Sequence, residues 1–181
     1  QVVDVKTNKV LIDEVDNRNQ LDWMPKSDKL IYFESDDSGF NMYQLDPATA
    51  DKKLLAKNVP LENFAISPDE KTLYYSKKES IETKSPEGLT RLLSPEDRQD
   101  YYRNRYQIYQ YQLENGISQQ ITFGSNSTSI QDISKDGKYL LFSTNEEYLT
   151  QRPFSRSSLY KLDLQTMQSE TIWKSKAFIG G

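Results

Sequence analysis

Residues 23–33 read Trp23-Met24-Pro25-Lys26-Ser27-Asp28-Lys29-Leu30-Ile31-Tyr32-Phe33, and this pattern occurs three times in the chain. The other two copies run from Ile66 to Ser76 and from Ile133 to Ser143, and all three align without a gap. Each copy has the apolar end of one strand, a short polar turn, and a second strand rich in Leu, Tyr and Phe. Stacked copies of one supersecondary unit determine a whole architecture, so this repeat outranks every other signal. The repeated unit is a β-hairpin.

Two more strands follow each hairpin. The spacing from Trp23 to Ile66 is 43 residues, inside the range of about 40–45 expected for a four-stranded propeller blade. The spacing from Ile66 to Ile133 is 67 residues, so the second blade carries 24 extra residues. Four short antiparallel strands with polar turns form the blade of a β-propeller. The expected third strands lie at 41–46, 108–111 and 159–162, and the expected fourth strands at 53–56, 119–123 and 170–173.

These repeats predict an all-β fold, a partial β-propeller of about three and a half four-stranded antiparallel blades. We treat residues 1–181 as a single propeller domain. Because propellers close with about 4–8 blades, we expect the chain to belong to a larger ring. The expected units are a half blade at 1–16, a blade at 20–57, a blade at 61–123 with an insertion at 79–105, and a blade at 128–175.

The insertion in the second full blade predicts a short helix. Ser94-Pro95-Glu96-Asp97 supplies an N-cap, a proline at the first helical position and acids in the first turn. The helix would run to Arg103 or Arg105. At helical spacing Arg98, Tyr101, Tyr102 and Arg105 would share one face.

Composition excludes several kinds of chemistry. The chain has no His and no Cys, so it cannot hold a Ser-His-Asp or Cys-His relay or a zinc site built on those ligands. Gly-x-Ser-x-Gly, P-loop and Gly-x-Gly-x-x-Gly motifs are absent as well. A pair of carboxylates stays open as an acid and base, but 27 acidic residues make such pairs frequent by chance. We therefore expect that the chain itself is not an enzyme and binds no cofactor or metal.

The charge of the chain bears on its partners. A net charge of −4 argues against nucleic acid, because phosphate binding needs a basic face. The sequence has no apolar run near the roughly 20 residues that a membrane span requires. We also expect the isolated chain to self-associate, because an open arc exposes strand edges and an apolar blade face.

Ser67-Pro68-Asp69 with Lys71, and Ser134 with Asp136-Gly137-Lys138, resemble the WD-like repeats of TolB-like propellers. They also resemble the N-terminal propeller of prolyl oligopeptidase-family serine peptidases. In both groups an apolar residue or Trp precedes Ser-Pro-Asp-Gly-Lys and a strand ending in Phe-x-Ser. The first copy departs from this pattern at residues 24–28. The motif covers all three blades, but many propellers share it, so it indicates fold more strongly than function.

A second stretch looks like the dipeptidyl peptidase-like branch of that family from Bacteroidetes-type bacteria. It runs from Arg91 to Arg105 and is joined by Ile121-Thr122-Phe123-Gly124 and by residues 132–134. The resemblance implies a non-catalytic propeller that caps the active site of a C-terminal α/β-hydrolase domain of the same parent chain. It also implies selection of short peptide substrates and a periplasmic or extracellular location, with a cytoplasmic one left open. The alternatives are a TolB-like binding scaffold without catalysis and a carbohydrate-active propeller.

Two groups are candidate substrate contacts. On the expected helix, Arg98 and Arg105 could bind a carbonyl or carboxylate while Tyr101 and Tyr102 stack on side chains. The alternative is a helix that packs on the propeller rim or an adjoining domain.

The second group is Glu146-Glu147. In dipeptidyl peptidase relatives, a propeller Glu pair binds the substrate ammonium, a cation with several donors. Here the pair follows a second strand, whereas the family pair sits on a helical segment ahead of a first strand. A solvated loop is therefore the alternative.

The tryptophans and the turn aspartates are assigned structural roles. Trp23 and Trp173 fall at the end of a first strand and in a fourth strand, so we predict that they pack between blades. Asp69 and Asp136 lie in hairpin turns. We expect them to cap those turns through their own backbone rather than to bind calcium.

The absence of His and of a nucleophile motif generates a first prediction. The purified 181-residue chain should not hydrolyse dipeptide-derivatised chromogenic substrates. The measurement is release of chromophore, with a mock purification as the control for contaminating protease. Turnover above that control, following the chain through successive columns, would contradict the prediction.

Overall fold

The computed structural model describes residues 2–12, 18–37, 39–59, 63–79, 104–147 and 155–175. Every regular element in these ranges is a β-strand. The strands are β1 (Val2–Asp4), β2 (Lys9–Ile12), β3 (Arg18–Trp23), β4 (Leu30–Asp36), β5 (Gly39–Leu45), β6 (Lys52–Ala56), β7 (Phe64–Ile66), β8 (Thr72–Glu79), β9 (Arg105–Gln112), β10 (Ser118–Gln120), β11 (Ser127–Ile133), β12 (Tyr139–Glu147), β13 (Ser155–Asp163) and β14 (Ser169–Lys174).

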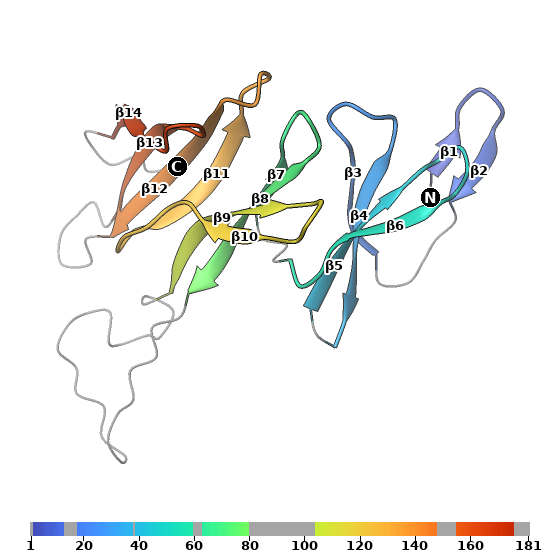
Figure 1. Cartoon of the computed structure of the whole chain (residues 1–181), viewed down its shortest axis with the longest axis horizontal. Helices are drawn as coiled ribbons and strands as arrows, with labels where there is room; N and C mark the ends of the chain where they lie inside the picture. Colours follow the sequence, from blue (N-terminus) through green and yellow to red (C-terminus); the bar gives the residue numbers. More distant parts are fainter. Residues whose placement is uncertain are drawn as a thin grey trace, which may run out of the picture.

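The described strands form one two-stranded sheet and three four-stranded sheets. Strands β1 and β2 make the half blade, β3–β6 make blade 1, β7–β10 blade 2 and β11–β14 blade 3. Neighbouring strands in each sheet are antiparallel and consecutive in the chain. The sheets follow one another in chain order (Figure 1). The prediction of an all-β partial propeller with four-stranded antiparallel sheets is confirmed at this level.

The helix expected in the insertion is not supported. Residues 80–103, which include Ser94-Pro95-Glu96-Asp97, lie outside the described residues. Arg105 is the first residue of β9 and lies opposite Glu79 of β8. A helix reaching Arg105 is therefore wrong, because the ladder of blade 2 begins at that residue.

The hairpin turns of the repeat are held by their own side chains. In blade 2, Ser67 Oγ donates to Asp69 Oδ1 at 2.5 Å, and the backbone N–H of Lys71 donates to the same oxygen at 3.2 Å. In blade 3, Ser134 Oγ and the N–H of Lys138 donate to Asp136 Oδ1 at 2.7 and 3.1 Å. The hydroxyl and then the backbone donors hold the pKa of both Asp69 and Asp136 below 3.8. The predicted turn-capping role of the two aspartates is confirmed.

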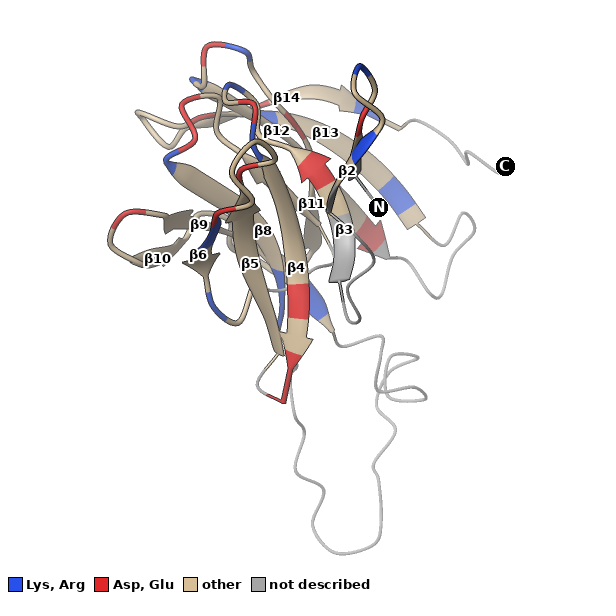
Figure 2. Ribbon diagram, turned by 90° about the vertical axis from the view of Figure 1, so that its right-hand side faces the viewer, with Lys and Arg blue, Asp and Glu red and all other residues tan. Residues whose placement is uncertain are grey.

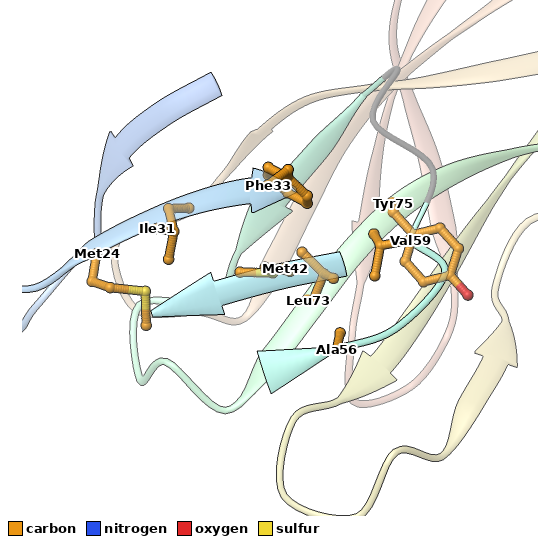
Figure 3. Packing of buried hydrophobic residues seen from close by; sticks show 8 residues of the cluster. All are labelled: Met24, Ile31, Phe33, Met42, Ala56, Val59, Leu73 and Tyr75. Carbon is orange, nitrogen blue, oxygen red and sulfur yellow. The ribbon is translucent and has the colours of Figure 1, made fainter. Parts of the chain in front are cut away.

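Alternation along the second strands buries both faces of blade 2. Leu73 and Tyr75 of β8 pack in a cluster with blade 1 residues, whereas Tyr74 between them packs in a cluster with blade 3 residues. Successive strand residues point to opposite faces, so one strand joins two interfaces. Figure 3 shows the first cluster, which includes Phe33, Met42 and Val59.

Each blade repeats one aromatic stack between its second and third strands. The pairs are Tyr32–Tyr43, Tyr75–Tyr109 and Phe142–Tyr160, with ring centroids 5.6, 5.7 and 5.3 Å apart. The members of each pair lie directly opposite in the ladder. Such cross-strand aromatic pairs stabilise a sheet beyond their area burial.

Neither tryptophan is buried between two of the described sheets, so their packing role stays a prediction. Trp173 is 44% exposed, although its counterparts Ala56 and Ile121 are 2% and 6% exposed because a following blade covers them. No sheet is described after β14, so Trp173 has no such cover. Trp23 is 57% exposed. It lies on the face of β3 that points away from blade 2. The only sheet described before β3 in the chain has two strands.

A single carboxylate joins the turns of blades 1 and 2. Glu70 Oε1 accepts hydrogen bonds from the backbone N–H groups of Lys26 at 2.7 Å and Ser27 at 2.6 Å. Partial burial alone would raise the pKa of Glu70, but these donors outweigh it and hold the pKa below 4.5. Two backbone donors that converge on a carboxylate form an anion-binding concavity. Blade 2 thereby fills an anion site in the turn of blade 1.

Core burial predicts that Tyr32→Ala and Leu140→Ala are both strongly destabilising. Each side chain is 0% exposed. Large-to-small changes at such sites cost about 2–5 kcal/mol of unfolding free energy. Denaturant midpoints would be measured against Leu21→Ala, whose side chain is 53% exposed and should change the midpoint little. Unchanged midpoints for both core variants would show that the inward faces are misassigned.

The Glu70 contact predicts a pH-dependent contribution to stability. The folded pKa is below 4.5, so the contribution is complete above that pH and is lost as the pH falls through the folded value. The difference in urea midpoint between wild type and Glu70→Gln should therefore be larger at pH 7 than at pH 3. Comparison with Glu114→Gln, an exposed turn residue, controls for general charge effects. A difference that does not change with pH would contradict the role of the carboxylate.

Candidate functional site

Two long connections leave the same end of blades 2 and 3. In an antiparallel meander, the link from the second to the third strand and the link to the next sheet emerge at one end. In blade 2 the first of these links joins Glu79 to Arg105, and in blade 3 it joins Glu147 to Ser155. We call this the insertion end. In blade 1 the equivalent link is short, from Asp36 to Gly39.

A polar cavity of about 270 Å³ lies between blades 2 and 3 at the insertion end. Every residue that lines it carries a hydroxyl or an amide, and none is charged. Its position follows from the strands that supply it, since Ser76 and Asn145 lie within three residues of the long connections. The lining includes Asn63, Ser76, Tyr106, Ser127, Ser129 and Asn145.

Asn63 lines this cavity, and its side-chain amide pairs with the backbone of Ile130 as a neighbouring strand would. Its Nδ2 donates to the carbonyl oxygen of Ile130 at 3.1 Å, and its Oδ1 accepts from the N–H of Ile130 at 2.6 Å. Ser76 Oγ donates to the same Oδ1 at 3.1 Å. One side-chain amide thus replaces a backbone pair between two blades and fixes their separation at the insertion end.

A buried hydrogen-bond network holds the crossover from blade 2 to blade 3 on β9. Thr122 Oγ1 donates to Gln107 Oε1 at 2.9 Å and accepts from the N–H of Ile108 at 2.7 Å. Gln107 Nε2 donates to the carbonyl oxygen of Asn126 at 3.0 Å. Thr128, which lines the polar cavity, lies 2.9 Å from Thr122 Oγ1. Gln107, Thr122 and Thr128 are all buried, so their satisfied polar groups make this seam rigid.

Tyr109 of β9 bonds to a carboxylate at the insertion end. Its hydroxyl donates to Glu79 Oε1 at 2.8 Å. Burial, and then this hydrogen bond, raises the pKa of Tyr109 to about 12. The phenol therefore remains a neutral donor throughout the physiological range.

The structure brings some of the predicted site residues to the insertion end. Arg105 begins β9 beside Tyr106, its Nε donates to the carbonyl oxygen of Ser125, and its Nη1 donates to that of Asn104 at 2.9 Å. These bonds direct the guanidinium to the main chain rather than to a shared helical face. Arg98, Tyr101 and Tyr102 lie outside the described residues.

Glu146 and Glu147 end strand β12, opposite Arg156 and Ser155 of β13. The loop considered for these glutamates is therefore wrong, because the ladder continues to Glu147. A strand assigns consecutive positions to opposite faces of its sheet. That arrangement does not by itself join two carboxylates into one cation site, so the role of the pair in binding an ammonium stays a prediction.

Sequence reasoning missed the residues of the polar cavity. The only signal is the run of small polar residues from Ser125 to Ser129, which reads as an ordinary turn. Asn63 carries no pattern at all, because its function depends on a strand 67 residues further along the chain.

The described part of the chain shows neither a metal site nor a membrane-spanning helix. It contains no group of three or more His, Cys, Asp or Glu residues placed to hold a metal ion. It also contains no helix that is long and apolar enough to cross a membrane.

Comparisons with known proteins relate the chain to propellers by structure alone. No protein-family model and no curated protein sequence matches it. An acylaminoacyl peptidase of Pyrococcus horikoshii superposes with a TM-score of 0.65 at 11% identity, over 88% of this chain and 25% of that one. TolB from Acinetobacter baumannii superposes with a TM-score of 0.55 at 16% identity, over 90% of this chain and 33% of TolB. Oligogalacturonate lyase from Vibrio parahaemolyticus superposes with a TM-score of 0.59 at 17% identity, over 98% of this chain and 47% of the lyase.

These similarities establish the fold. The chain spans between a quarter and a half of the length of these solved proteins. At such low identity, proteins with different activities share the same repeats.

Proposed function

We propose that this chain is the non-catalytic propeller portion of an exported serine peptidase of the prolyl oligopeptidase family. In this proposal it caps the active site of a C-terminal α/β-hydrolase domain and helps to select short peptide substrates. The dipeptidyl peptidase-like branch is the specific form of the proposal, and it rests on residues 91–105 and 121–124.

One observation carries the proposal. The two long connections of blades 2 and 3 leave the same end, directly beside the polar cavity. Long insertions on one end of a rigid scaffold commonly carry the contacts to a ligand or an adjoining domain. The insertion end is therefore the face of the propeller that we assign to the hydrolase domain.

The chemistry of the cavity favours a peptide over an acidic sugar. A peptide main chain presents neutral N–H donors and carbonyl acceptors, which hydroxyl and amide groups match in both directions. The lining of the polar cavity has no Lys or Arg that could bind a carboxylate. This favours peptide binding over an oligogalacturonate-type ligand at this position.

The first test is the coding sequence that follows codon 181. A peptidase predicts further blades and then Gly-x-Ser-x-Gly with a later Asp and His. A reading frame with a few more blades and no such motif would overturn the proposal and support the TolB-like scaffold.

The second test uses the full-length protein and dipeptide-derivatised chromogenic substrates. Asn145 is an exposed amide that lines the polar cavity, so Asn145→Ala should raise KM about two- to tenfold with little change in kcat. Asn115→Ala, at an exposed turn of blade 2 remote from the cavity, is the matched control and should change neither constant. Hydrolysis with the same KM for both variants would show that this cavity does not select the substrate.

A further inference from the structure

The crossovers between blades allow a position-by-position comparison. Ala56 lies opposite Met42, and Ile121 donates its N–H to the carbonyl oxygen of Ile108. Met42 and Ile108 hold the same place, one residue before the stacked tyrosine of the third strand. Ala56 and Ile121 therefore hold equivalent places in the two crossovers. Three residues after Ala56 the first crossover has Val59, and three residues after Ile121 the second has Gly124.

Val59 fills the interface between blades 1 and 2. Its side chain is 2% exposed and belongs to the cluster that contains Leu73 and Tyr75 (Figure 3). Gly124 has no side chain, its φ is +124°, and nothing lies within 4 Å of the point where a Cβ would stand. The interface between blades 2 and 3 therefore lacks the residue that closes its neighbour.

An outer cavity of about 440 Å³, with Gly124 in its lining, lies between this crossover and blade 3. Its lining includes the stacked Phe142 and Tyr160 with Leu162 and Ile121. Phe142, Ile121 and Leu162 are at most 7% exposed, so the accessible apolar surface is that of Phe123, Met167 and the half-buried Tyr160. The corresponding stack in blade 2, Tyr75 and Tyr109, packs in the cluster that contains Val59. Thr128 lines both the outer cavity and the polar cavity, so the two hollows adjoin along one seam.

The chemistry of the outer cavity specifies a ligand. None of its lining residues is Lys, Arg, Asp or Glu, so it offers no counter-charge to an ionic group. Phe123 is 75% exposed at the rim, and Met167 is 42% exposed. An aromatic ring that entered would contact Phe123, Met167 and the exposed part of Tyr160. Thr144, Ser169 and Asn126 supply hydroxyl and amide groups for neutral hydrogen-bonding partners.

We propose that the outer cavity binds an aromatic side chain carried by an uncharged peptide segment. The ring lies against Phe123, Met167 and Tyr160, and the flanking peptide amides bond to the hydroxyl and amide groups of the lining. The volume falls in the range of about 300–1,000 Å³ typical of small-ligand sites. This site is separate from the proposed peptidase function and needs no catalytic domain.

The test uses the 15N-labelled 181-residue chain and two uncharged probes. N-acetyltryptophanamide carries an aromatic ring between two amides, and N-acetylglycinamide carries the amides alone. We expect saturable amide shift changes at residues 121–126, Thr144 and Ser169 with the first probe and none with the second. Equal shifts with both probes, or shifts centred on other strands, would overturn the proposal.

Phe123→Ala tests the rim. Loss of one aromatic contact should raise the Kd for N-acetyltryptophanamide about fivefold. Ile117→Ala removes a side chain that is also exposed, at 61%, and lies outside the cavity, so it should leave the Kd unchanged. Equal Kd values for the two variants would overturn the proposal. If Phe123→Ala altered the fold, seen as amide shifts throughout the unliganded spectrum, the comparison of the two probes on wild type would decide the question.

Discussion

Burial of sheet faces against neighbouring sheets is the constraint on which the structure depends. A four-stranded antiparallel sheet with one covered face can alternate apolar and polar residues, but β8 presents Leu73 and Tyr75 to one neighbour and Tyr74 to the other. Blade 2 is therefore buried on both faces by its two neighbours. Figure 2 shows charged residues in turns and near strand ends, and some within strands as well. Packing of sheet against sheet lets a chain with only 35% hydrophobic residues build apolar clusters between neighbouring blades.

The repeat predicted the strands because hairpin turns and strand alternation are local. Ser67 and Asp69 bond to their own turn, and Tyr32, Tyr75 and Phe142 occupy one position of the repeat, so the sequence pattern and the structure agree there. Burial was predicted less well, because it depends on what covers a position. Trp173 occupies the same place as Ile121, yet it is exposed, because the next sheet that covers Ile121 has no described equivalent after β14.

The candidate site could not be predicted for a related reason. Asn63 and Ile130 are far apart in the chain, and no periodicity links an amide to the backbone of another blade. The Glu146-Glu147 pair was considered because a Glu pair binds the substrate ammonium in dipeptidyl peptidase relatives, whereas the structure shows only that the ladder of β12 continues through both positions. Conspicuous residues and functional geometry are thus different things in a repeat protein, where most side chains serve the interfaces.

Departures from the repeat are where a repeat protein can acquire a site. The seam between blades 1 and 2 is closed by Val59 and by the Glu70 carboxylate, whereas the seam between blades 2 and 3 has Gly124 and a glycine, Gly137, at the position that corresponds to Glu70. This second seam has its own apolar cluster, which includes Tyr74, Leu140 and Phe142. It also has directional hydrogen bonds from Gln107, Thr122 and Asn63. Apolar packing needs filled volume, but hydrogen bonds can fix two sheets at a distance with space between them. Both cavities lie in this second interface, beside its apolar cluster and next to these hydrogen bonds.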